Sequence, residues 1–195
     1  MINSNKESDI YLLRQRSKAW HSIIDQFGIS QALKNNAIDT HQYQAWLCHN
    51  LSYAEYILSE VDIAPDKYSL YHKYLPTTEH IRLLRSDIND HYISCTKPVK
   101  IDQKEEDMPA MIPVYIYQGS VMGKKMIQRF LKDRNCKFSM QYINQATDNS
   151  NMKDFLQDAS MIKSQLNQEK FIKAIDLMWG SIIENYRHYT NVSQS

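Results

Sequence analysis

The amino-acid sequence predicts an all-α protein, and two observations carry this prediction. Glycine and proline are scarce, with 4 and 5 among 195 residues, or about 5% together where roughly 12% is average. Because β-hairpin turns and nucleotide-binding loops need glycine, β-rich and Rossmann-type folds are disfavoured. Apolar residues instead recur at the three- and four-residue spacing of amphipathic helices. Hydrophobic residues make up 43% of the chain, which is enough for the core of one domain.

Seven or eight helices in a single domain account for this spacing. We expect them at residues 8–27, 40–58, 65–76, 78–88, 113–134, 152–166 and 168–189, with a short further segment at 29–35. The segment 137–145 is ambiguous. The domain is expected to span residues 8–190, with a disordered or extended segment at 1–7 and a polar tail at 191–195.

Capping residues and prolines justify the helix starts in order along the chain. Ser8 or Asp9 can cap the first helix, and Asp39 or Thr40 the second. Pro65 fits the first turn of the third.

The later elements follow from the same signals. Thr77 or Thr78 can cap a helix, and Pro113 fits the first turn of the next one. Between them, residues 97–109 are charged and bounded by prolines, which predicts an exposed loop. Residues 146–151 have the composition of a turn.

Charge and cysteine usage exclude several classes of protein. The net charge is +1, whereas a general nucleic-acid binder carries a basic excess. No apolar run reaches the ~18 residues that a membrane span needs, and no targeting segment is evident. The three cysteines, Cys48, Cys95 and Cys136, are widely spaced. A disulfide framework is therefore not expected. We expect a soluble cytoplasmic protein. The sequence does not indicate an oligomeric state.

One candidate site lies on the first helix. At 3.6 residues per turn, Arg14, Lys18, His21 and Asp25 fall on one stripe. A carboxylate one turn after a histidine can orient the imidazole for metal ligation, and the two cations can meet anionic groups of the same ligand. The alternative is a solvated face whose charges support the helix.

A second candidate site is the segment 114–131. It contains half of all the glycine, Gly119 and Gly123, within an otherwise helical pattern. Each glycine costs roughly 1 kcal/mol against alanine in a helix interior. Spacing of four places both on one face, which suits either close approach of a flat ligand or close helix packing.

Together the two segments resemble the heme oxygenase family, most closely its bacterial, biliverdin-producing branch. In that family an N-terminal helix supplies a proximal histidine, with basic residues before it and a carboxylate one turn after. The stripe of Arg14, Lys18, His21 and Asp25 matches this element.

The second element also resembles that family, whose kinked distal helix carries a pattern like G-[DS]-x-x-G-G. Gly119, Ser120 and Gly123 match it, and Tyr117 stands where an aromatic residue commonly precedes the first glycine. The separation of about one hundred residues between the two elements fits as well.

The resemblance implies a heme-oxygenase-like helical bundle that binds heme between these two helices. It implies that His21 is the axial metal ligand, with Asp25 as acceptor for its other ring N–H. Arg14 and Lys18 would contact the propionates, and Tyr117 would lie in the heme site.

The resemblance also implies an oxidoreductase that cleaves heme to biliverdin, CO and ferrous iron. Heme would be both cofactor and substrate, O2 the oxidant, and an external reductase the electron donor. Gly119 and Gly123 would form the distal side, where Ser120 would help to deliver protons.

Several positions depart from the family pattern. Lys124 replaces the second of two adjacent glycines, so a long side chain could crowd the heme or point away. Ser120 stands where well-known members have an aspartate, and Asp25 where a glutamate is usual. Lys153 and Lys163 are candidates for the second propionate.

Two other functions of the same fold remain open. The changes at Ser120 and Lys124 suit a non-catalytic member that binds heme or a protein partner. A non-heme di-iron oxidase is a less favoured reading, because Asp87 and His91 have the spacing of an iron-ligating pair. Its further ligands would come from the acidic residues Glu55, Glu60 and Glu79.

The remaining special residues have simpler interpretations. Cys136 resembles the catalytic cysteine of thiaminase-II-like proteins but has no surrounding motif. Trp179 is expected to anchor the core, as are the other two tryptophans, and Met122 and Met126 are expected to fill irregular core space.

Overall fold

Helix α3 lies at the centre of the protein, where it packs against five of the other helices. The computed structural model describes residues 8–26, 28–35, 37–90, 95, 108–132, 140–145 and 152–191. Its helices are α1 (Asp9–Ile24), α2 (Gly28–Lys34), α3 (Thr40–Ile63), α4 (Pro65–Tyr68), the 3-10 helix η1 (Ser69–Tyr74), α5 (Thr78–Asp90), α6 (Met111–Lys132), α7 (Gln141–Asn144), α8 (Met152–Ser160) and α9 (Gln168–Asn191). The described ranges contain no strand, so the predicted all-α class is confirmed.

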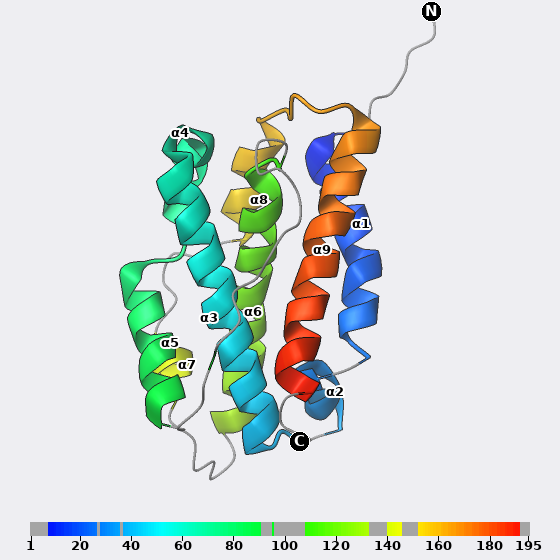
Figure 1. Cartoon of the computed structure of the whole chain (residues 1–195). Coiled ribbons are helices and arrows are strands. Elements are labelled where there is room, and N and C mark those ends of the chain that lie inside the picture. Colours follow the sequence, from blue (N-terminus) through cyan, green and yellow to red (C-terminus); the bar gives the residue numbers. More distant parts are fainter. Residues whose placement is uncertain are drawn as a thin grey trace, which may run out of the picture.

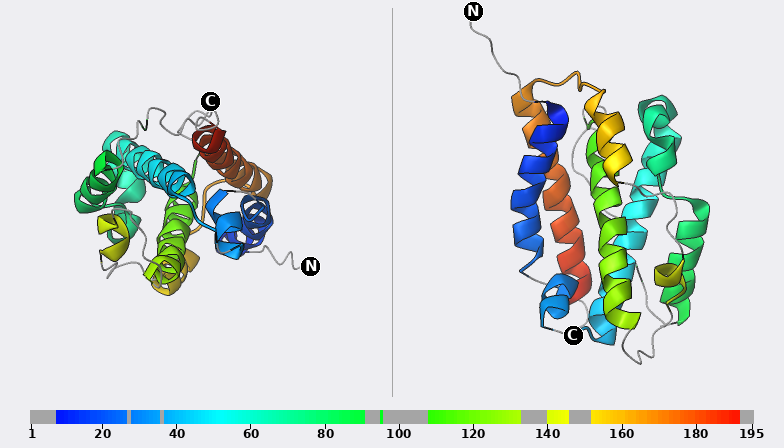
Figure 2. Two further views of the ribbon diagram at one scale, coloured as in Figure 1. Left: turned by 90° about the horizontal axis from the view of Figure 1, so that it is seen from below. Right: turned by 180° about the vertical axis from the view of Figure 1, so that it is seen from behind.

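The bundle has two layers. Helices α5, α3, α9 and α1 form a curved row, which is the first layer (Figure 2, left). Helix α6 belongs to the second layer, on the inner side of this curve, where it packs against α3 and α9. Helix α8 packs on α6 and α1, and the short α7 packs on α5 and α6. Helices α1, α6 and α9 run in the same direction, and α3 runs opposite to them (Figure 1).

The start of α3 agrees with the prediction from its capping residues. The Asp39 carboxylate accepts the backbone N–H of Gln42 at 2.7 Å, and the Gln42 side chain accepts the backbone N–H of Asp39 at 3.1 Å. This reciprocal capping box satisfies two N–H groups that the first helical turn leaves without carbonyl partners.

The structure divides some of the expected helices. The segment 65–76 forms α4 and η1, and the ambiguous segment yields α7, so the described residues hold nine α-helices and one 3-10 helix. Helix α8 ends at Ser160 and not near residue 166. The backbone N–H of Ser164 donates to the Asp9 carboxylate at 2.6 Å, which draws the chain toward the start of α1 and out of helical geometry.

Parts of several predictions lie outside the described residues. These are the N-terminal segment 1–7, the loop residues 97–107, the turn 146–151 and the tail 192–195. Within the described part of the chain, no helix is long and apolar enough to cross a membrane.

A disulfide between Cys48 and Cys95 corrects the expectation drawn from cysteine spacing. Cys48 is buried in the middle of α3, and its Cα lies 5.3 Å from that of Cys95. The bond ties the central helix to the chain that leaves α5, across a sequence separation of 47 residues. The wide spacing of the cysteines in the sequence did not indicate this bond, because the antiparallel packing of α5 on α3 returns the chain to the level of Cys48.

Reduction of this disulfide is expected to destabilise the protein. Closing a loop of this length lowers the entropy of the unfolded chain, and the chain-entropy model gives a stabilisation of about 4 kcal/mol. Urea unfolding with and without reductant measures the effect. A Cys48→Ala, Cys95→Ala double variant should show no response to reductant, and an equal midpoint of the wild type in both conditions would contradict the prediction.

His49 joins α3 to α9 inside the bundle. Its Nδ1 lies 2.9 Å from the Asn185 side-chain oxygen, and its ring meets the edge of Tyr186 at 5.2 Å. Burial lowers the pKa of His49 to about 4, although the bond to Asn185 opposes the shift. The folded protein therefore holds this histidine neutral.

Acid is expected to destabilise the fold through His49. The unfolded chain takes up a proton near pH 6.5 and the folded chain only near pH 4, so stability falls as the pH drops between these values. Going from pH 7 to pH 5 should lower the free energy of unfolding by up to about 2 kcal/mol. Urea unfolding at the two pH values tests this. His49→Gln should lose most of the pH dependence, whereas the exposed-site control His72→Gln should retain it.

Candidate functional site

The buried Ser17 hydroxyl lies where the three helices that surround the candidate site come together. Ser17 on α1 is fully buried and accepts the indole N–H of Trp179 from α9 at 3.0 Å. Tyr115 on α6 lies close to Ser17; burial raises the pKa of Tyr115, and the Arg14 charge and the nearby Ser17 hydroxyl oppose that shift. Ser17, Tyr115 and Trp179 therefore lie at one level, and the Asp176 carboxylate on α9, which accepts from Arg16 and from the Trp20 indole N–H, holds α1 and α9 in the same register.

This alignment places parts of the two predicted segments at the same height. The three helices run in the same direction (Figure 1) and rise equally per residue. One turn beyond Ser17, Tyr115 and Trp179, the chain therefore places His21, Gly119 and Ile183 at a common level. Viewed from behind, α9 lies between α1 and α6 (Figure 2, right), and it packs on both.

His21 is exposed on one side and packed on the other. Its ring meets the edge of Trp179, with centroids 4.8 Å apart and planes at 68°. Burial lowers the pKa of His21, and the charge of Asp25 opposes this. Because the shift favours the neutral imidazole, a ring nitrogen is available as an acceptor or metal ligand near neutral pH.

The other residues of the α1 stripe are arranged more loosely than predicted. The Asp25 carboxylate lies 3.8 Å from the Lys34 ammonium, which also donates to the Asp25 backbone carbonyl at 2.9 Å. Asp25 thus acts on His21 through its charge. Arg14 and Lys18 are exposed on the same helix, and Arg14 is close enough to Tyr115 to affect its pKa.

The glycine face of α6 is open. A Cβ added at Gly119 or Gly123 would meet no atom within 4 Å. The same face of α6 carries Met122 and Met126, which are 49% and 64% exposed, so the expectation that they fill the core is wrong. Backbone and flexible apolar side chains therefore form an accessible surface next to α1.

Tyr117 and Lys124 lie on the opposite face of α6. Lys124 is 1% exposed, and its ammonium sits 4.2 Å from the centre of the Tyr142 ring. It therefore does not crowd the glycine face. Tyr117 is 4% exposed and packs near His80, so it is not brought together with His21. The Ser120 hydroxyl donates to the Tyr117 backbone carbonyl at 2.7 Å.

The two lysines considered for a second propionate lie in the α8 region. Lys153 is on α8 and Lys163 follows it, and both are exposed. Helix α8 packs on α1 and α6, but neither lysine is tied to His21 or to the glycines by a described contact.

The residues of the di-iron interpretation serve other purposes. The Asp87 carboxylate accepts the backbone N–H groups of Gln141 and Tyr142, each at 3.0 Å, and so caps α7. Glu55 and Glu79 form ion pairs with arginines at 2.7 Å. Among the described residues, no group of three acidic, histidine or cysteine side chains could hold a metal ion. His91 and Cys136 lie outside those residues.

Little in the sequence indicates the contact between Ser17 and Trp179. Trp179 was expected to be a core residue, and it is 2% exposed; its support of His21 was not predicted. The available signal was a small polar residue, Ser17, on the apolar side of the first helix, where a buried hydroxyl requires partners.

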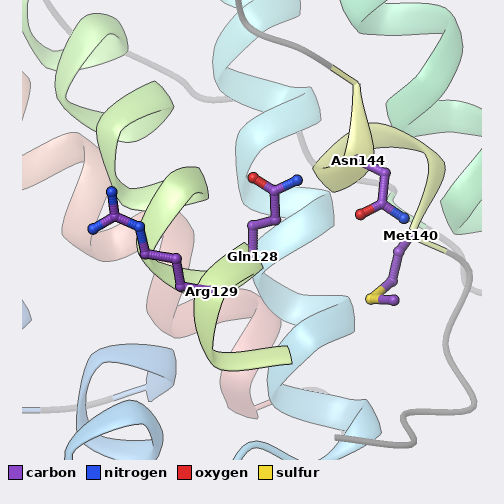
Figure 3. Close-up of a pocket in the computed structure, with 4 residues that line it drawn as sticks. All are labelled: Gln128, Arg129, Met140 and Asn144. Carbon is purple, nitrogen blue, oxygen red and sulfur yellow. The ribbon is translucent and has the colours of Figure 1, made fainter. Parts of the chain in front are cut away.

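A pocket of about 430 Å³ lies on the other side of α6, near its C-terminal end. It is lined by Gln128, Arg129, Met140 and Asn144. Figure 3 shows Gln128 pointing from α6 toward Asn144 and Met140 beside α7.

Comparison with family models, with curated proteins and with solved structures gives no match to this chain. Functional assignment therefore depends on the chemistry of the residues themselves.

Alanine at either glycine of α6 is expected to stabilise the protein. Since an added Cβ meets nothing, Gly119→Ala and Gly123→Ala should each raise the free energy of unfolding by up to about 1 kcal/mol through helix propensity. Urea unfolding measures this. Ala19→Gly, at an exposed site within α1, is the inverse control and should lower stability by a similar amount. Marked destabilisation by either alanine would mean that the glycine face is closed.

Proposed function

We propose that this protein binds heme between α1 and α6, with His21 as the axial ligand, and cleaves it to biliverdin, CO and ferrous iron as a heme oxygenase. The observation that carries the proposal is the open glycine face of α6 at the level of His21. A flat macrocycle needs such a stretch of backbone on one side and a neutral imidazole on the other.

The residues present suit heme in three respects. His21 is held neutral by its partial burial against Trp179, which is the protonation state of an axial ligand. Met122 and Met126 offer flexible apolar surface. Arg14 and Lys18 supply exposed cations on the His21 stripe, where they would pair with the propionates.

When bound, heme would supply the redox-active iron and the substrate carbon, with electrons from an external reductase. Gly119 and Gly123 would leave room beside the macrocycle and restrict how a small molecule lies there. Ser120 would have to turn its hydroxyl away from the Tyr117 carbonyl, 2.7 Å away, before it could hold a water molecule and pass on a proton.

The Ser120 bond also favours a second candidate function, heme binding without turnover. A hydroxyl that donates within its own helix is not available to donate to a ligand. A non-catalytic member would keep His21 and the glycine face and lack effective proton delivery.

Hemin titration tests the binding proposal. The wild type should develop a Soret band typical of histidine ligation. His21→Ala should lower hemin affinity by about tenfold or more, or about 1.4 kcal/mol, with a changed spectrum, and His72→Ala, an exposed histidine on η1, should behave as wild type. Gly123→Leu should fold normally and bind hemin poorly, because its side chain would occupy the open face.

Turnover separates the two candidates. Loss of the Soret band with growth of biliverdin absorption, after addition of a reductant and O2, would support the oxygenase. A stable ligated spectrum under the same conditions would support the binder. An unchanged hemin spectrum and affinity in His21→Ala would refute the ligand assignment in both.

A further inference from the structure

A cluster of polar side chains is enclosed between α5, α6 and α7, on the face of α6 opposite the glycines. The His80 ring on α5 lies 6.5 Å from Tyr117 on α6 and 6.2 Å from Tyr142 on α7. The Lys124 ammonium lies 4.2 Å from the centre of the Tyr142 ring. Tyr117, Lys124 and Tyr142 are each no more than 4% exposed. We call this group the α5–α7 chamber.

Two hydrogen-bonding groups in the chamber have no partner. His80 Nδ1 lies 2.9 Å from the Thr77 hydroxyl oxygen and 3.4 Å from the Thr77 backbone nitrogen, and His80 Nε2 is buried without a partner. The Tyr117 hydroxyl is likewise buried without a partner. Leaving such groups unsatisfied costs about 1–3 kcal/mol each, so an acceptor atom that met the Tyr117 hydroxyl, or Nε2 in its protonated tautomer, would stabilise the folded chain.

Lys124 adds a cation to these two groups. Its ammonium has a long contact of 3.3 Å to the Gln145 backbone carbonyl. Burial lowers the pKa of Lys124 to about 8, although the Asp87 charge opposes the shift. The Asp87 carboxylate is engaged by the two α7 backbone N–H groups. Closer anionic oxygens would stabilise the charged lysine.

The pocket near the C-terminal end of α6 lies beside the chamber. Gln128 lies one helical turn beyond Lys124 on the same face, and Asn144 precedes Gln145, whose carbonyl contacts Lys124. Figure 3 shows these two amide side chains pointing into the same space. Arg129 lines the pocket too, and its positive charge would attract anions.

We propose that the α5–α7 chamber binds a small oxyanion, a carboxylate or phosphate group, through Lys124 Nζ, the Tyr117 hydroxyl and His80 Nε2. The ligand enters through the pocket lined by Gln128, Arg129 and Asn144. This site is separate from the proposed heme site, since α6 lies between the two, and it does not depend on heme binding.

Thermal unfolding with acetate or inorganic phosphate, each against chloride at equal ionic strength and neutral pH, tests the proposal. A ligand that binds only the folded state raises Tm as its concentration rises. The wild type should gain about 3 °C or more near saturation with at least one of the two anions. The anion that acts shows whether the chamber prefers carboxylate or phosphate.

Three variants distinguish this site from general salt effects, which act on all variants alike. Tyr117→Phe removes one unpartnered hydroxyl, so it should fold at least as well as wild type without the anion and lose most of the gain. Lys124→Met should lose the gain entirely. Lys125→Met, at the exposed neighbouring position, should keep it. No gain in the wild type, or an equal gain in Tyr117→Phe, would overturn the proposal and leave water as the occupant.

Discussion

The polar contacts that join α1 to α9, from Trp179 to Ser17 and from Arg16 and Trp20 to Asp176, are the constraint on which the candidate site depends. Interlocking side chains give three packed helices a preferred register, and directional polar contacts make it stricter by opposing small axial shifts. A buried hydroxyl with defined partners does not tolerate them, since a shift leaves polar atoms unsatisfied. Because Ser17, Trp179 and Tyr115 lie at one level, His21 and Gly119 lie at the same height one turn later.

Helix α6 has two faces of different chemistry. One presents the backbone of Gly119 and Gly123 with exposed methionines, and the other carries Tyr117 and Lys124 into a polar chamber. Lys124 is one of the positions at which this sequence departs from the heme oxygenase pattern that it resembles. Its burial against Tyr142 explains how a lysine can follow the second glycine without obstructing the face that the glycines keep open.

The disulfide and the helix ends show where local reasoning fails. The spacing of Cys48 and Cys95 carries no information about their distance, because the packing of α5 on α3 brings them together. Helix α8 ends early because Ser164 bonds to Asp9, a residue 155 positions away. In contrast, the start of α3 was predictable, since the Asp39 capping box uses only neighbouring residues.

The sequence by itself determined the helical class, most helix starts, and which residues share the α1 stripe and the glycine face of α6. These follow from glycine content, capping residues and the 3.6-residue period. Only the tertiary structure decided that His21 and Gly119 lie at one level, that Lys124 points away from them, and that Tyr117 joins His80 in a separate chamber. The physical reason is that periodicity places a side chain on a face of its own helix, whereas the choice of neighbouring helix depends on contacts between residues far apart in the chain.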